Sequence, residues 1–161
     1  MSSEMQYSIA TGADAPWIAS MSRDLIESEL GWSWNRDRVM GAIRDPDTIV
    51  LKARRHQRAV AFAILGVGSD EAHLLLLAVA QDRRRLGIGS RLVGWLEESA
   101  LIAGVGIVRL EVRASRVPER RFYQSLGYRS VAMSPGYYDG REAAVRMAKD
   151  LWERRHTPTD R

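Results

Sequence analysis

Apolar residues recur every three or four positions over residues 14–30, and this spacing predicts an amphipathic helix. Asp14 is expected to cap its N-terminus, and Pro16 falls in the first turn, where proline is tolerated. A second helix is predicted from near Asn35 to the break at Asp45–Pro46–Asp47. The apolar positions of the first helix are Ile18, Met21, Leu25, Ile26 and Leu30.

The middle of the chain changes to short runs of β-branched and aliphatic residues. Three such runs, separated by polar turns, are Thr48–Ala53, Ala59–Gly66 and Ala72–Ala80. They predict successive strands of an antiparallel meander. From Gly87 the pattern returns to helical spacing for about four turns, until the glycines at 104 and 106 end it.

The last third of the chain alternates between the two patterns. Strands are predicted over Ile107–Val112, Tyr128–Met133 and Ala143–Lys149, with a short helix over Pro118–Leu126. Residues 153–161 have no apolar pattern, so they are expected to form a frayed tail after a single domain over residues 1–152. The sum is an α/β architecture, a mixed sheet with helices on both faces.

Composition excludes several classes of protein. The 161 residues are 45% hydrophobic, which suits one domain with a core of its own. There is no apolar run long enough for a membrane span and no secretory signal pattern, so a soluble cytoplasmic protein without a membrane partner is expected. Without cysteine there is no disulfide or thiolate nucleophile, and three scattered histidines predict no metal site.

The positive charge is almost entirely arginine. There are 24 Lys and Arg against 20 Asp and Glu, and the only lysines are Lys52 and Lys149. Arginine suits bidentate contacts to phosphate, but a net charge of +4 is too small to make nucleic acid the expected primary partner. The alternative of an RNA or ribosome binder would rest on an arginine patch made of Arg54, Arg55, Arg83, Arg84 and Arg85.

Residues 74–92 carry the strongest local signal, a buried-looking strand that runs into arginines, two glycines and a helix. Such a turn can bind a pyrophosphate, because glycine lets the backbone approach and the first helical N–H groups are free to donate. The alternative is a tight turn with solvated arginines. A dinucleotide-binding Rossmann site fits poorly, because the third glycine of its motif is missing.

A polar stripe runs along the strand over residues 107–113, where Arg109, Glu111 and Arg113 alternate with aliphatic residues. In a covered sheet this indicates an open cleft or an edge. Glu111 could then be a general base with a tuned pKa, or it could belong to a charge ladder that faces solvent. Tyr123, on the next short helix, offers a phenol.

These residues also carry a family resemblance. The segment AVAQDRRRLGIGSRL resembles the acetyl-coenzyme A signature of the GNAT N-acetyltransferase superfamily. Arg84, Gly87 and Gly89 of this chain match the arginine and the two glycines of that signature. LEVRASRVPERRFYQSLGYRSV and GYYDGREAAVRM resemble its downstream parts. The similarity extends over residues 48–147 and is greatest to the branch that acetylates ribosomal-protein alanine termini.

The resemblance implies a central mixed sheet of about seven strands that opens after the fourth strand and binds acetyl-coenzyme A, with no metal. It implies that backbone N–H groups of Leu77, Ala78 and Val79 polarise the acetyl thioester. It assigns Glu111 as general base and Tyr123 as proton donor to the leaving thiolate. The pyrophosphate would be wrapped by Arg84, Arg85, Leu86, Gly87, Ile88, Gly89 and Ser90.

The chain departs from the family at Arg116, where the family commonly has an asparagine that contacts the pantetheine arm. Arg116 could reach a coenzyme A phosphate instead, or it could obstruct the usual position of the arm. By analogy the acceptor entrance is bordered by Trp32, Trp34, Tyr137, Tyr138 and Arg141. For the two tryptophans the alternative is a packing cluster between helices.

The function expected from these features is direct, acetyl-coenzyme A-dependent transfer of acetyl to a primary amine. The first candidate acceptor is the N-terminal α-amine of a protein such as a ribosomal protein. The alternatives are a small-molecule amine or a lysine side chain as acceptor, and, in another class, a non-catalytic module that binds acetyl-coenzyme A. The oligomeric state, monomer or homodimer, stays open.

Overall fold

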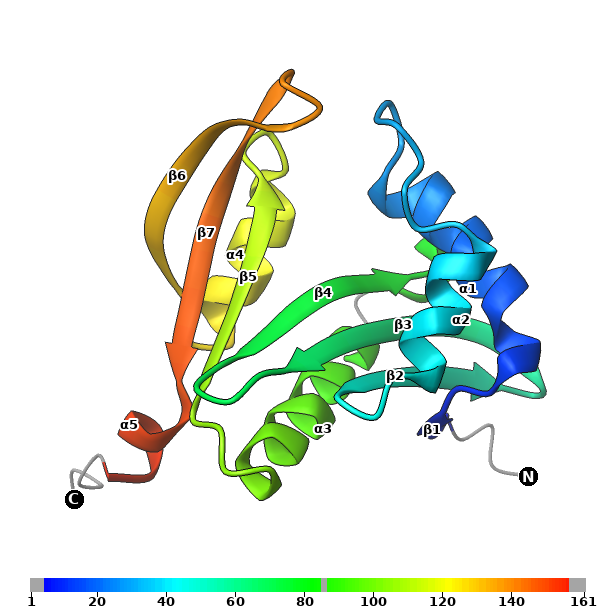
Figure 1. Cartoon of the computed structure of the whole chain (residues 1–161), viewed down its shortest axis with the longest axis horizontal. Helices are drawn as coiled ribbons and strands as arrows, with labels where there is room; N and C mark the ends of the chain where they lie inside the picture. The colour runs from blue at the N-terminus through cyan, green and yellow to red at the C-terminus, as the bar shows by residue number, and fades with distance from the viewer. Residues whose placement is uncertain (1–4, 85–86, 157–161) are drawn as a thin grey trace. The chain divides into compact units, whose positions relative to one another are not determined.

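The computed structural model describes residues 5–84 and 87–156 (Figure 1). The chain divides into two compact units. Unit 1 is formed by Met1–Gly66 and Leu74–Leu96, and unit 2 by Val67–His73 and Glu97–Arg161.

Unit 1 is built on the strands β1 (Gln6–Ile9), β2 (Thr48–Arg55), β3 (Arg58–Val67) and most of β4 (Ala72–Val79). β2 pairs antiparallel with β1 and with β3, and β4 lies beside β3 in the sheet. The three strands predicted from the aliphatic runs are therefore confirmed. β1 is an additional strand that the hydrophobic pattern did not single out.

Both faces of this sheet are covered. The helices α1 (Ala15–Met21) and α2 (Arg36–Arg44) pack on one face, and α3 (Ile88–Ile102) lies on the other (Figure 1). The six consecutive residues Val60 to Leu65 of β3 are accordingly all buried, as expected for a strand without a solvent face. The core under α1 and α2 includes Ile18, Val39, Phe62, Ile64 and Leu76.

Asp14 begins the first helix, but its carboxylate does not cap it. The side chain is 1% exposed. It accepts hydrogen bonds from Thr11 N, Trp17 Nε1 and Lys52 Nζ at 2.7–2.8 Å, and from Arg54 Nη2 at 3.2 Å. Burial by itself raises the pKa of Asp14, but these donors outweigh it and lower the pKa to about 2. Asp14 therefore ties α1 to β2.

Unit 2 continues the sheet with β5 (Ile107–Arg113), β6 (Arg129–Tyr138) and β7 (Glu142–Asp150), and has the helices α4 (Val117–Ser125) and α5 (Leu151–His156). β7 pairs antiparallel with both β5 and β6. The first two residues of β4 pair parallel with β5, Ala72 with Val108 and His73 with Arg109.

The sheet is therefore mixed, with the strand order β1-β2-β3-β4-β5-β7-β6. The ladder between β4 and β5 is recorded only for the two residue pairs at the start of β4. The α/β class, the seven strands and the opening of the sheet after the fourth strand are confirmed.

Two predicted boundaries differ in the structure. The first helix does not continue to Leu30, because after Met21 it widens into a π-helical turn over Ser22–Ile26 and then ends. Residues 153–156, expected to be frayed, belong to α5, whose start is fixed where Leu151 N donates to Gly106 O at 2.7 Å. Within the described ranges, no helix is long and apolar enough to cross a membrane.

A buried ion pair links α3 to the end of β7 inside unit 2. Lys149 Nζ contacts both carboxylate oxygens of Glu97 at 2.9 and 3.0 Å, and the Tyr128 hydroxyl donates to the same carboxylate at 3.0 Å. Lys149 is 6% exposed and Tyr128 2%. Because a charge buried in this way is costly when its partner is lost, the pair constrains the two elements strongly.

We expect Lys149→Met to lower the free energy of unfolding by about 3–5 kcal/mol, because Glu97 is left without its cation. The double variant Lys149→Met/Glu97→Leu should recover most of that loss. Urea unfolding of the single and double variants measures both values. A double variant no more stable than the single one would contradict this account.

Candidate active site

A histidine near the start of β4 contacts a glutamate of β5. Because the two strands run parallel with His73 beside Arg109, the His73 side chain reaches Glu111, two residues further along β5. His73 Nε2 lies 2.5 Å from Glu111 Oε2. Arg109 Nη1 donates to Glu111 Oε1 at 3.2 Å, and Arg109 Nε lies 2.6 Å from Glu71 Oε1.

Glu111 is not part of a ladder facing solvent, because its side chain is only 8% exposed. Burial alone raises the pKa of its carboxyl group. The hydrogen bond and charge of His73, with the charges of Arg109 and Arg146, outweigh burial and hold the pKa of Glu111 below its ordinary value. Glu111 is therefore a charged, hydrogen-bonded carboxylate at neutral pH.

The hairpin of β6 and β7 brings two tyrosines to this carboxylate. Arg146 pairs with Glu111 across the strands, and its guanidinium lies 6.0 Å from the Tyr137 ring. The rings of Tyr137 and Tyr138 meet edge to face at 4.9 Å. Burial raises the pKa of both phenols, and the charge of Glu111 raises it further. Of the residues expected at the acceptor entrance, these two are near Glu111, whereas Arg141 is exposed in the hairpin turn.

Tyr123 lies on α4 and is 8% exposed. Its ring packs against Phe122 at 5.0 Å and against Tyr128 at 5.7 Å. Burial, and after it the charges of Glu119 and Tyr138, raise the pKa of Tyr123 well above its ordinary value. The phenol therefore stays protonated at neutral pH. Tyr138 is within electrostatic range of both Tyr123 and Glu111.

Glu142 holds the loop that leads from β5 into α4. Its carboxylate accepts hydrogen bonds from the Ser115 hydroxyl, from Ser115 N at 3.0 Å and from Arg113 Nε at 2.8 Å. These bonds, that from the Ser115 side chain first, lower the pKa of Glu142 to about 2. The loop ends at Arg116, the residue before α4, which is half-buried.

Apart from Arg116, the predicted cofactor residues fall in unit 1, at the end of β4, in the turn after it and at the start of α3. Leu77, Ala78 and Val79 are the last residues of β4. Arg84 is exposed, and its Nε donates back to Val79 O at 3.3 Å. Gly87 has φ +77°, which a residue with a side chain rarely adopts. The predicted pyrophosphate residues Arg85 and Leu86 lie outside the described residues.

The first turn of α3 is Ile88, Gly89 and Ser90, of which Ile88 is buried and Ser90 exposed. The first N–H groups of a helix have no partner inside the helix and favour an anion. A positive-φ glycine, this helix start and the exposed Arg84 beside it fit a phosphate-bearing substrate.

The two predicted tryptophans have different environments. Trp34 is 8% exposed and belongs to the core of unit 1, with the Arg38 guanidinium 3.9 Å from its ring centre. The packing alternative therefore describes Trp34. Trp32 is 44% exposed, and the guanidinium of Arg23 lies 5.5 Å from its ring.

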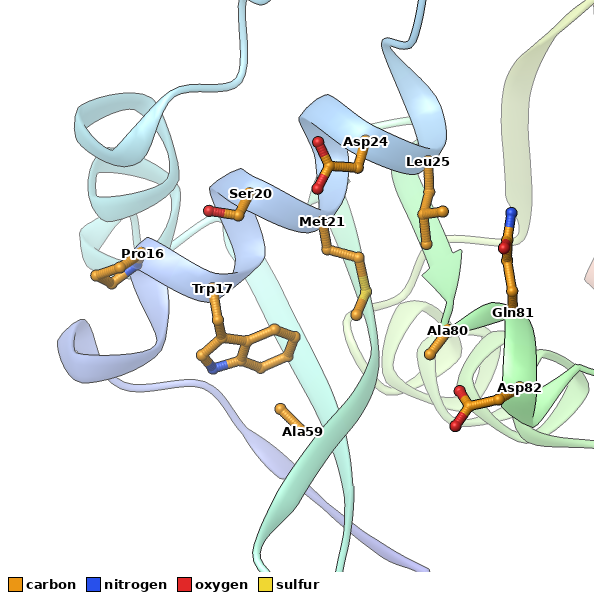
Figure 2. A pocket seen from close by; sticks show the side chains of 10 residues that line it. All are labelled: Pro16, Trp17, Ser20, Met21, Asp24, Leu25, Ala59, Ala80, Gln81 and Asp82. Atoms are coloured by element: carbon orange, nitrogen blue, oxygen red, sulfur yellow. The ribbon is translucent and has the colours of Figure 1, made fainter.

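A pocket of about 810 Å³ opens beside α1 in unit 1 (Figure 2). Figure 2 shows side chains of α1 and of the π-helical turn facing residues that follow β4. The pocket is lined by Pro16, Trp17, Ser20, Met21, Asp24, Leu25, Ala59, Ala80, Gln81 and Asp82.

His73 is the residue that sequence reasoning missed at this site. It was considered only as a scattered histidine, and its contact with Glu111 depends on the register between two parallel strands. The signal that could have found it is its place in β4, between the buried residues Ala72 and Leu74, where its side chain points away from the aliphatic face. Among the residues that the structure describes, no cluster of His, Asp and Glu is suited to a metal ion.

The fold and the residues of this site define a class of protein. The model of the acetyltransferase (GNAT) family matches residues 11–128, so the chain belongs to that family. A segment of 94 residues is 40% identical to the [ribosomal protein bS18]-alanine N-acetyltransferase of Escherichia coli K12. It covers 56% of this chain and 64% of that relative, so the match spans less than two thirds of the relative's length.

Solved structures of the family have the same fold. The ribosomal-protein-S18-alanine N-acetyltransferase from Escherichia coli superposes with a TM-score of 0.76 at 30% identity, over 92% of this chain and 94% of that one. The PaiA N-acetyltransferase from Thermoplasma acidophilum, solved in complex with coenzyme A, superposes with a TM-score of 0.76 at 19% identity, over 91% and 99% of the two chains.

The contact between His73 and Glu111 can be tested by titration. We expect His73→Phe to raise the pKa of Glu111, because the variant removes the hydrogen bond and charge that stabilise the carboxylate while keeping it covered. His73→Gln, which retains a donor without the charge, should raise it less. Carbon-detected NMR titration of the glutamate carboxyl groups measures both, and an unchanged pKa in His73→Phe would contradict the account.

Proposed function

We propose that this protein is an acetyl-coenzyme A-dependent N-acetyltransferase whose acceptor is the N-terminal α-amine of a protein, of the ribosomal-protein-alanine type. The observation that carries the proposal is Glu111, a buried carboxylate hydrogen-bonded to His73 and close to Tyr137 and Tyr138. The identity to an enzyme named for that acceptor supports it.

Unit 1 would supply the groups that bind the acetyl donor. The start of α3, Gly87 and Arg84 fit the pyrophosphate of coenzyme A. Backbone N–H groups of Leu77, Ala78 and Val79 would donate to the thioester oxygen and stabilise the negative charge that develops on it.

Unit 2 would supply the proton-transfer groups. Glu111 takes a proton from the ammonium group of the acceptor, and the neutral amine then attacks the thioester carbon. A C–N bond forms, the C–S bond breaks and the coenzyme A sulfur leaves with the bonding electrons. The nitrogen loses its second proton, which replaces the proton that Tyr123 gives to the sulfur. Tyr123 donates to that sulfur, and the burial that keeps the phenol protonated supports a hydrogen-bond donor. His73 orients Glu111.

The pKa of Glu111 favours an α-amine over a lysine as acceptor. A carboxylate with a lowered pKa is a weak base, so an amine that loses its proton easily suits it. An α-amino group has a pKa of roughly 8 and lysine roughly 10.4, so freeing the lysine amine costs about 3 kcal/mol more. The cytoplasm, where new protein N-termini emerge, is the expected compartment.

Acetyl transfer to a pair of peptides tests the acceptor. One peptide has a free alanine N-terminus and a blocked lysine, and the other a blocked N-terminus and a free lysine. We expect acetyl-coenzyme A to modify only the first, because its amine is the weaker base. Mass spectrometry identifies the modified position. Transfer only to the lysine peptide would overturn the proposed acceptor, and transfer to neither would overturn the proposed reaction with protein amines.

Two substitutions test the catalytic residues. We expect Glu111→Gln and Tyr123→Phe each to lower kcat by roughly 10²–10⁴-fold, because each removes one proton-transfer group and conserves shape. Binding of acetyl-coenzyme A, measured by calorimetry, should stay unchanged. Glu98→Gln, at an exposed position of α3, is the matched control and should retain full activity. Wild-type kcat in either variant would remove that residue from the mechanism.

A further inference from the structure

One buried carboxylate in unit 1 has no part in the proposed chemistry. Glu27 follows the π-helical turn Ser22–Ile26 and is 9% exposed. Its Oε1 accepts from Ser33 N at 2.9 Å and from Ser33 Oγ at 2.5 Å. Its Oε2 accepts from Trp34 N at 3.1 Å and from Ser22 Oγ at 3.3 Å.

These four bonds join two segments that regular structure does not hold together. Glu27 N also donates to Ser22 O at 2.8 Å, a bond that spans five residues and closes the π-helical turn. The loop between the turn and α2 contains Glu29 in the left-handed region, with φ +68°. A π-helical turn and a non-glycine residue at positive φ are uncommon features that concentrate at functional sites.

The loop held in this way displays Trp32. Its neighbour Trp34 anchors the loop in the core, while Trp32 stays 44% exposed with the Arg23 guanidinium over its ring. The same π-helical turn contributes Asp24 and Leu25 to the pocket of Figure 2. Glu27 thus bonds to Ser33 and Trp34 of the loop and to Ser22 of the turn that supplies one wall of the pocket.

We propose that Glu27 is a positioning residue that holds the Trp32 loop and the adjoining pocket wall in the shape that receives the acceptor peptide. The inference rests on the proposed function. A carboxylate that only ended the helix would need one or two donors, whereas this one accepts four, three of them from residues six and seven positions further along the chain. Exposed aromatic side chains on a rigid base are suited to binding peptides.

The test separates acceptor binding from chemistry. We expect Glu27→Gln to raise the KM for the acceptor peptide about tenfold, the size expected for losing a hydrogen bond to a charged group. The kcat at saturating peptide and the Kd of acetyl-coenzyme A should stay unchanged, since Glu27 touches neither substrate in this account. Trp32→Ala should raise the same KM, and Glu98→Gln, the matched exposed control, should change nothing.

Hydrogen exchange provides a second readout that does not depend on activity. The amides of Ser33 and Trp34 should exchange slowly in the wild type and faster in Glu27→Gln, because both donate to Glu27. Ser33→Ala, which removes only the hydroxyl donor, should give a smaller rise in KM, and it replaces Glu27→Gln should that variant not fold.

Several outcomes would overturn the proposal. The first is an unchanged KM for the acceptor peptide in Glu27→Gln, or in Ser33→Ala when that variant replaces it, whether or not the amides exchange faster. The second is a loss of kcat at saturating peptide. A wild-type protein that acetylates no peptide would instead overturn the proposed function. Unaltered exchange in Glu27→Gln would separately show that Glu27 does not hold the loop.

Discussion

A buried carboxylate needs enough hydrogen-bond donors or cations around it to replace water. At four places in this chain, meeting that need joins two elements or segments. Asp14 ties α1 to β2 through Lys52, and Glu97 ties α3 to β7 through Lys149. Glu27 ties a loop to the helix before it. Glu111 on β5 is held by His73, near the start of β4. Hydrophobic burial forms the cores, whereas these carboxylates fix how neighbouring elements and one loop are joined.

Sequence patterns predicted most of the fold, because aliphatic runs and helical periodicity depend on residues close together in the chain. The strands of the meander and the two ends of α2 are of that kind. The π-helical turn and helix α5 were not predicted, since the first depends on Glu27 closing back on Ser22 and the second on Leu151 bonding Gly106. The first is a local bond that departs from regular helical bonding, and the second joins residues far apart in the chain, so helix propensity predicts neither.

For the site, the resemblance supplied Glu111 and Tyr123, and the spacing along β5 showed that Glu111 lies on a polar stripe. Its electrostatic environment could not be predicted, because His73 and Arg146 reach it through strand register and not through sequence proximity. This environment lowers the pKa of Glu111 and so bears on how strong a base its carboxylate can be. A carboxyl group whose pKa lies below its ordinary value is a weaker base, so in the proposed mechanism it suits amines that release their protons readily.

The scarcity of lysine has a consequence for the protein's own chemistry. Its two lysines both have their ammonium groups in ion pairs with carboxylates, and their side chains are only 12% and 5% exposed. An ammonium in that position must lose both its proton and its partner before it can attack a thioester. The arginines that carry the remaining positive charge are not acylated under these conditions, because they keep their protons. If the protein uses the proposed acetyl donor, its own lysine side chains are thus protected against acetylation.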